Sequence, residues 1–369
     1  MRGLGMGHIH CPKWGGYSTG SIGRNRINGL HEEWAKKQRK TLLYSGSVVN
    51  MSKGMRGIHL YTGKGYGTVT TKMLNEFDGT NIHDYVVHLG NMDKVFFDYR
   101  KGKSDRNAVI DQMIDDLADF LPEYKASEIN YKDLYISLPA LSNDITTIKN
   151  VDDFYDDYRS YMRKVEKTCI DILGEDGWKF RIEGFYFRTE TIFPIDQKIS
   201  STSPTSNKMV KLLNDIAYRV RKTHKKEFMW APYYGFGTYA ENIIHNLGVI
   251  ANRTDIFDII CIQPQYYFQG DPYRVNVDKV FDSADSQKVY DLDGDVVGGG
   301  RKTSATALIG VTMEGDDNYR KSRSDRFDYY VDTFSGIVKE APIVFYAGST
   351  HNLLNNNPLF DAINNFYEV

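Results

Sequence analysis

Two glutamates lie where their carboxyl groups could perform acid–base chemistry together. Glu190 follows the aromatic run FRIEGFYF, and Glu314 follows the apolar run TALIGVTM. Both runs have the composition of buried strands, so each glutamate is expected at or just past a strand end. Two carboxyl groups that flank a glycosidic bond can cleave it, one as general acid and the other as nucleophile or base. Because exposed loop ends are commonly acidic, as Asp316 and Asp317 illustrate, the opposing interpretation is a pair of solvated side chains.

The residues around each glutamate predict which role it takes. Glu190 comes shortly after Phe185, Tyr186 and Phe187, and burial against aromatic faces raises the pKa of a carboxyl group. A raised pKa suits a general acid, which must hold its proton near neutrality. Glu314 is followed by Gly315, which lets the backbone approach the site closely, and a neighbouring Tyr266 hydroxyl would stabilise its ionised form, so Glu314 is the predicted nucleophile.

Residue types that bind sugars follow two further runs, EFMWAPYY and FDIICIQPQYY. Aromatic rings stack on the C–H face of pyranose rings, and amide groups bond to hydroxyls as donor and as acceptor. About half of these side chains must instead fill the protein interior, because a strand alternates between two faces. The predicted substrate-binding residues are Trp230, Tyr233, Tyr234, Gln265, Tyr266, Asp98, Arg188 and Tyr346. For Asp98, pairing with Arg100 and bordering the site remain alternatives.

Eight short apolar runs alternate with helical patterns from about residue 54 onward. The runs span residues 56–62, 94–100, 133–141, 180–187, 227–234, 257–267, 306–313 and 342–348. Apolar residues between them recur at helical spacing, as Ile110, Met113 and Leu117 do. No two-residue hairpin turn separates neighbouring runs, which favours parallel pairing through helical crossovers.

The pattern predicts an α/β protein with a single (β/α)8 TIM barrel over residues 54–369, its active site beyond the carboxyl ends of the strands. The alternative is an open, doubly wound sheet. It is weaker because the glycine run from Gly63 to Gly67 lacks the third glycine of a dinucleotide-binding fingerprint. Residues 1–53 are predicted to form a short basic extension, with nine Lys and Arg against two Asp and Glu.

Composition excludes several classes of protein. The net charge of −2 provides no global field for nucleic acid, and no apolar run is long enough for membrane insertion. Three cysteines without a CxxC pair indicate neither a disulfide framework nor zinc, so no metal or cofactor is predicted. The N-terminus lacks the apolar segment of a secretory signal, and extracellular, phage-borne and cytoplasmic action remain alternatives. The sequence does not predict the oligomeric state.

Four segments, IEGFYFRTE, MWAPYYG, CIQPQYYF and IGVTMEGD, occur in this order. Together they resemble a poorly characterised bacterial family of TIM-barrel domains, which is similar to the glycoside hydrolase clan with catalytic glutamates on strands four and seven. The resemblance covers roughly residues 54–350. It implies that Glu190 is the acid/base, that Glu314 is the nucleophile, and that Tyr266 donates a hydrogen bond to Glu314.

The resulting hypothesis is a retaining glycoside hydrolase that acts on a polysaccharide or oligosaccharide. The alternative is a catalytically silent carbohydrate-binding or structural barrel, which would keep the aromatic mouth without working carboxylates. The two differ in geometry, because a retaining enzyme holds its two carboxyl groups about 5–5.5 Å apart.

Overall fold

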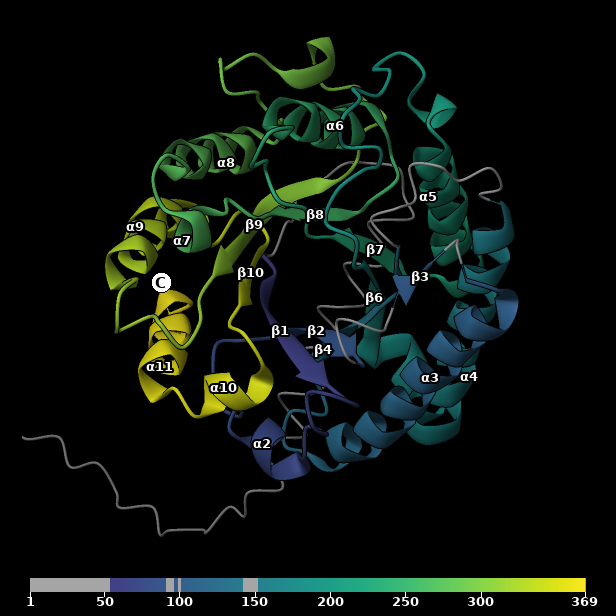
Figure 1. The fold of residues 1–369 in the computed structure, drawn as a ribbon. Helices are drawn as coiled ribbons and strands as arrows, with labels where there is room; N and C mark the ends of the chain where they lie inside the picture. Colours follow the sequence, from purple (N-terminus) through teal and green to yellow (C-terminus); the bar gives the residue numbers. More distant parts are fainter. Residues whose placement is uncertain (1–53, 91–95, 99–100, 142–151, 369) are drawn as a thin grey trace, which may run out of the picture. The chain divides into compact units, whose positions relative to one another are not determined.

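The structure is a computed structural model that describes residues 54–90, 96–98, 101–141 and 152–368. The predicted basic extension, residues 1–53, lies outside these ranges. The described chain forms a closed barrel of eight strands in the order β1-β2-β4-β6-β7-β8-β9-β10, and every neighbouring pair is parallel (Figure 1). The predicted single (β/α)8 barrel is therefore confirmed.

The barrel strands are short, as is usual for this architecture. They are β1 (Arg56–Thr62), β2 (Asp84–Leu89), β4 (Asp133–Ser137), β6 (Ile182–Phe187), β7 (Glu227–Trp230), β8 (Ile259–Ile262), β9 (Leu308–Glu314) and β10 (Ile343–Tyr346). Several are shorter than their predicted runs. The run 227–234 leaves the barrel after Trp230, and the run 257–267 does so after Ile262.

The second barrel strand differs from the prediction. Strand β2 pairs with β1 and β4, whereas of the predicted run 94–100 only Phe96–Phe97 is a strand, β3, which pairs with β5 (Ala140–Leu141) in a separate two-stranded sheet. Residues 94, 95, 99 and 100 lie outside the described ranges. The segments DYVVHL and KVFFDYR each contain four apolar or aromatic residues, so composition does not show which of them enters the barrel. The Asp84 carboxylate accepts a hydrogen bond from Arg56 N at 3.0 Å.

Helices surround the barrel (Figure 1). They are α2 (Thr71–Asn75), α3 (Lys103–Ala126), α4 (Asp152–Arg181), α5 (Lys208–Arg219), α6 (Ala240–Arg253), α7 (Tyr266–Gln269), α8 (Arg274–Ser286), α9 (Ser324–Phe334), α10 (Thr350–Leu354) and α11 (Asn357–Phe366). The predicted stripe Ile110, Met113 and Leu117 is buried on α3. Within the described ranges, no helix has the length and apolar character to cross a membrane.

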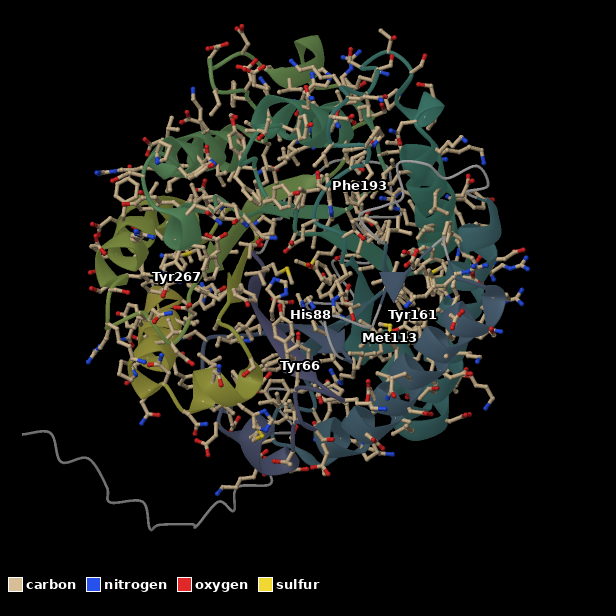
Figure 2. All side chains as sticks on the ribbon, in the orientation of Figure 1. Tyr66, His88, Met113, Tyr161, Phe193 and Tyr267 are labelled. Carbon is tan, nitrogen blue, oxygen red and sulfur yellow. The ribbon has the colours of Figure 1, made fainter. Side chains whose placement is uncertain are left out.

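The core has two parts. The smaller cluster takes alternate residues from the barrel strands and their immediate neighbours, and therefore fills the inside of the barrel: Met55, Val86, Tyr135, Tyr186, Met229, Ala231, Ile259, Cys261 and Val344. The larger cluster combines the opposite faces of the strands with the apolar stripes of the helices. In Figure 2, His88 lies within the ring of strands and Met113 among the surrounding helices. Which face a strand residue occupies thus decides whether it can reach a site inside the barrel mouth.

Candidate active site

The chemically interesting side chains share the inward face of their strands. Tyr186 on β6 belongs to the inner core, and Arg188 and Glu190 follow it at spacings of two residues. Because side chains of extended chain alternate, Arg188 and Glu190 keep the direction of Tyr186. The same spacing relates Thr312 to Glu314 on β9. Two strands on different sides of the barrel thereby carry a glutamate toward its mouth.

A cavity of about 130 Å³ lies at the carboxyl ends of the strands. We call it the mouth cavity. It is lined by His59, Tyr61, His88, Ala140, Tyr186, Arg188, Glu190, Gln263, Thr312 and Tyr346. Of these lining residues, Glu190 alone carries a carboxyl group. Its position agrees with the end of a TIM barrel at which active sites lie.

Glu190 faces this cavity with a fixed partner. Gln263 Nε2 donates to Glu190 Oε1 at 2.9 Å and also to the carbonyl oxygen of Ala231 at 2.6 Å. The side chain of Glu190 is open to solvent through the cavity, but the protein around it disfavours the charged carboxylate and raises its pKa. The Gln263 hydrogen bond and the charge of Arg188 act in the opposite direction without cancelling the rise.

Glu314 is not one of the cavity-lining residues and is fully buried. Its Oε1 accepts a hydrogen bond from Gln265 N at 3.2 Å, and its Oε2 accepts one from the Tyr330 hydroxyl at 2.5 Å. The pKa of Glu314 is raised to about 8, mainly by burial and to a smaller extent by the nearby charge of Glu190, against the lowering effect of these two donors. Near neutral pH, burial therefore favours the protonated form of Glu314.

The donor at Gln265 depends on an uncommon backbone conformation. Gln265 has a φ of 66°, in the left-handed region that non-glycine residues seldom adopt. In this conformation its N–H meets Glu314, and its side-chain Nε2 donates to Gln263 Oε1 at 3.4 Å. Gln265 thus connects the two glutamates, since Gln263 is the partner of Glu190.

Two histidines form part of the cavity wall. His59 Nδ1 and His88 Nε2 share a hydrogen bond at 2.7 Å, and the ring of Tyr61 stacks on His88 with centroids 4.3 Å apart. Burial lowers the pKa of His59 to about 3 and that of His88 well below its usual value. The positive charge of Arg188 contributes to both shifts. Both rings are therefore neutral at physiological pH, and they add polarity without charge.

Arg188 supplies the positive charge of the mouth cavity. The residue is 8% exposed, and its Nη1 donates to the carbonyl oxygen of Leu89 at 3.0 Å. Its Nη2 has no hydrogen-bond partner among the described residues. Buried donors are usually satisfied, which makes this one notable.

Two predicted binding residues lie in the core instead of at the mouth. Trp230 is 1% exposed, donates its Nε1 to the Thr189 carbonyl oxygen at 2.7 Å, and stacks on Phe257. Trp230 shares the outward face of β7 with Phe228, two residues earlier, so it faces the helices. Tyr234 is fully buried, and its hydroxyl donates to the Tyr290 carbonyl oxygen at 2.6 Å. The expectation that these two rings line the mouth is corrected accordingly.

The remaining predicted residues are placed as follows. Tyr346 lines the cavity, and the half-buried Tyr233 donates its N–H to the Glu190 carbonyl oxygen at 3.2 Å. Tyr266 begins α7 and packs against Tyr329 and Tyr330 of α9. The hydroxyl that reaches Glu314 is that of Tyr330, which corrects the expectation for Tyr266.

Asp98 is buried after β3, its carbonyl oxygen accepts from Lys101 N at 3.0 Å, and it is not one of the cavity-lining residues. Its proposed partner Arg100 lies outside the described residues.

Sequence reasoning assigned no site role to Tyr61, His88, Tyr186 or Tyr330. Tyr61 and Tyr186 lie on the inward faces of correctly predicted strands, so strict alternation from Glu190 or along β1 would have found them. His88 was missed together with its strand, β2. Tyr330 reaches the site from a helix, which no strand pattern indicates.

The described residues contain no group of three or more His, Cys, Asp or Glu side chains arranged to hold a metal ion. No family model matches the chain, and no curated protein matches it in sequence.

Three solved structures resemble the fold at a distance. A GH18 chitinase from Pseudoalteromonas aurantia is 11% identical, over 84% of this chain and 99% of that one, with a TM-score of 0.39. The xylanase and alpha-amylase inhibitor protein XAIP-II from Scadoxus multiflorus is 12% identical, over 84% and 96%, with a TM-score of 0.42. The inhibitor protein XAIP-I in complex with trehalose gives the same identity and coverage and a TM-score of 0.43. These similarities are too distant to assign an activity.

Proposed function

We propose that this protein cleaves glycosidic bonds in a polysaccharide or oligosaccharide, with Glu190 as the general acid. The observation that carries the proposal is the position of Glu190, which lines a cavity at the carboxyl ends of the barrel strands and has a raised pKa. A general acid must keep its proton near the working pH and must reach the leaving oxygen. The raised pKa of Glu190 favours the first condition, and its exposure to the cavity meets the second.

In the proposed step, the Glu190 proton passes to the glycosidic oxygen as the bond from that oxygen to the anomeric carbon breaks. Gln263 fixes the carboxyl group on the cavity side through its 2.9 Å hydrogen bond. The ring of Tyr61 borders the same space but stacks on His88, whereas the partly exposed ring of Tyr346 is available to contact a sugar ring. The cavity therefore combines a proton donor with a surface for a sugar ring. No other lining residue has a carboxyl group that could donate the proton.

The identity of the group that attacks the anomeric carbon depends on Glu314. A carboxylate nucleophile must be ionised and must contact the anomeric carbon. Glu314 is enclosed, and its pKa of about 8 keeps it protonated near neutrality. The geometry therefore favours water or a group of the substrate as the attacking group. The retaining mechanism with two glutamates requires Glu314 to ionise and Gln265 to move aside.

The enclosure of Glu314 also favours the second candidate function, a saccharide-binding barrel without catalysis. The two functions separate in one experiment, which measures release of reducing ends from a panel of polysaccharides by the wild-type chain and by Glu190→Gln. We expect hydrolysis by the wild type, its loss in Glu190→Gln, and normal activity in the matched control Glu175→Gln, on the exposed surface of α4. Binding of a saccharide without any hydrolysis by the wild type would favour the binding protein.

A further inference from the structure

Among the described residues, the guanidinium of Arg188 is buried in the wall of the mouth cavity without an ion-pair partner, although its charge acts on Glu190 nearby. In the part of the chain that the structure describes, no carboxylate forms an ion pair with it, and its Nη2 lacks any hydrogen-bond partner. A buried, incompletely bonded charge is costly for a fold, because desolvation is not repaid by a partner. A bound ligand with a negative charge would supply the missing ion pair and hydrogen bond.

The other groups in the cavity do not provide this charge. His59 and His88 are neutral and have only imidazole nitrogens to offer. Glu190 must be protonated when it acts as the general acid, and burial of Glu314 favours its protonated form. Among the described residues that line the cavity, Arg188 then carries the one charge during the proposed reaction. The inference below rests on the proposed function at this point.

We propose that the substrate is an anionic saccharide, and that a carboxylate on its sugar ring, as in a uronic acid, pairs with Arg188. A guanidinium is planar and presents paired N–H donors that match the two oxygens of a carboxylate. Arg188 follows Tyr186 and precedes Glu190 on the same inward face, so a ring that binds beside Arg188 lies next to the proton donor. A neutral sugar would leave the charge of Arg188 unpaired. The carboxylate of an acidic sugar pairs with the charge of Arg188 and accepts a hydrogen bond from its Nη2.

The test compares acidic oligosaccharides with matched neutral ones. The probes are oligogalacturonate, oligomannuronate and a hyaluronan tetrasaccharide, each beside its carboxyl-reduced counterpart, which differs only in having a hydroxymethyl group in place of the carboxylate. A sulfated dextran oligosaccharide represents the other common source of negative charge on sugars. Binding is measured by calorimetry with full-length Glu190→Gln, whose amide imitates the protonated carboxyl group and prevents turnover.

We expect at least one uronate to bind about 10- to 100-fold more tightly than its carboxyl-reduced counterpart. This preference should disappear when Arg188→Gln is added and remain when Arg159→Gln is added. Arg159 is the matched control because it pairs with Asp156 on the outer helix α4 at 3.0 Å. The comparison of matched ligands on one protein does not depend on the folding of the Arg188 variant, which circular dichroism checks separately.

Equal affinity for the acidic and reduced forms, absence of binding by every uronate, or a preference that survives Arg188→Gln would each overturn the inference. Binding of the sulfated probe alone would overturn the assignment of a carboxylate. Wild-type hydrolysis of the reduced forms at the rate of the acidic ones would refute the inference and leave the proposed function standing. Uronate binding through Arg188 without any hydrolysis by the wild type would support the inference about the ligand and refute the proposed hydrolysis.

Discussion

The hydroxyl of Tyr330 lies 2.5 Å from Oε2 of Glu314, so a helix outside the barrel completes the bonding of a carboxyl group at the end of its seventh strand. Both residues are fully buried, and Gln265 N satisfies the other carboxyl oxygen at 3.2 Å. The cluster of Glu314, Tyr330 and Gln265 is thus closed, whereas Glu190 remains open to the mouth cavity. This difference in enclosure gives the two glutamates different chemistry.

Removal of the Tyr330 hydroxyl should destabilise the fold. In Tyr330→Phe the buried carboxyl group of Glu314 loses a hydrogen-bond donor, and we expect the free energy of unfolding to fall by about 1–3 kcal/mol in urea titrations. The matched control is Tyr329→Phe, because the Tyr329 hydroxyl donates to Asp278 at 2.7 Å in an exposed position. Its loss should cost less than about 1 kcal/mol. Equal losses in the two variants would contradict the closed cluster.

The pKa of Glu314 predicts a loss of stability at alkaline pH. Its pKa is raised from 4.5 to about 8 in the fold, so between these values the folded state binds more protons than the unfolded state. The free energy of unfolding must then decrease as pH rises through this range and level off above about 8. His59, lowered to about 3, has the opposite effect, but only below its unfolded pKa of 6.5.

The interval from pH 6.5 to 8 therefore isolates the carboxyl groups from the histidines. Urea unfolding of the wild type and of Glu314→Gln across this interval measures the slope. We expect a smaller slope in Glu314→Gln, because an amide does not titrate. Identical slopes would show that Glu314 titrates alike in the folded and unfolded states.

Alternation of side chains explains how much of the site the sequence could predict. The runs that became β6 and β9 were long enough to identify as strands, so Glu190 and Glu314 were placed correctly at their ends. The mouth position predicted for Trp230 is wrong because this residue lies two positions after Phe228, on the outward face of β7, which its residue type does not show.

Other features had no local signal. The strand that carries His88, DYVVHL, contains four apolar or aromatic residues, as does the run KVFFDYR, so local composition could not show which of the two pairs in the barrel. Residues such as Tyr330 enter through tertiary packing of α9, and nothing in the helix sequence distinguishes its inward tyrosine as a hydrogen-bond donor to Glu314.

The corrected position of Trp230 predicts a separation of stability from binding. Trp230→Phe removes the donor to the Thr189 carbonyl oxygen and leaves a gap beside Phe257, which should lower the free energy of unfolding by about 1–3 kcal/mol. Its affinity for a saccharide should stay near the wild-type value. Tyr346→Ala, at the cavity, should show the reverse pattern. Calorimetric affinity and urea unfolding of both variants check this, and a large loss of affinity in Trp230→Phe would place its ring at the mouth after all.

The acid role of Glu190 predicts the pH dependence of hydrolysis. Since only the protonated form donates, kcat/KM should fall as pH rises past the raised pKa of Glu190. The fall should shift to higher pH when the nearby positive charge is removed in Arg188→Gln, because Arg188 lowers that pKa. Profiles measured on a neutral substrate with an activated aryl leaving group should be flatter, as such a group departs without a proton. A profile that rises with pH would identify Glu190 as a base instead.

The enclosure of Glu314 predicts that this residue is not the group that attacks the anomeric carbon. Glu314→Gln keeps the size of the side chain and, like the protonated carboxyl group, carries no charge, and its amide oxygen can still accept from Gln265 N or from the Tyr330 hydroxyl. If Glu314 is protonated and enclosed during catalysis, Glu314→Gln should retain turnover within about tenfold of the wild type. Addition of azide to Glu314→Ala should then not change the rate.

The two-glutamate mechanism predicts the opposite. Loss of the nucleophile in Glu314→Ala would abolish turnover, and azide that enters the vacated space would restore it with inversion at the anomeric carbon. Analysis of the product by nuclear magnetic resonance distinguishes an inverted glycosyl azide from a free sugar. Its formation would require Glu314 to ionise and become accessible when substrate binds.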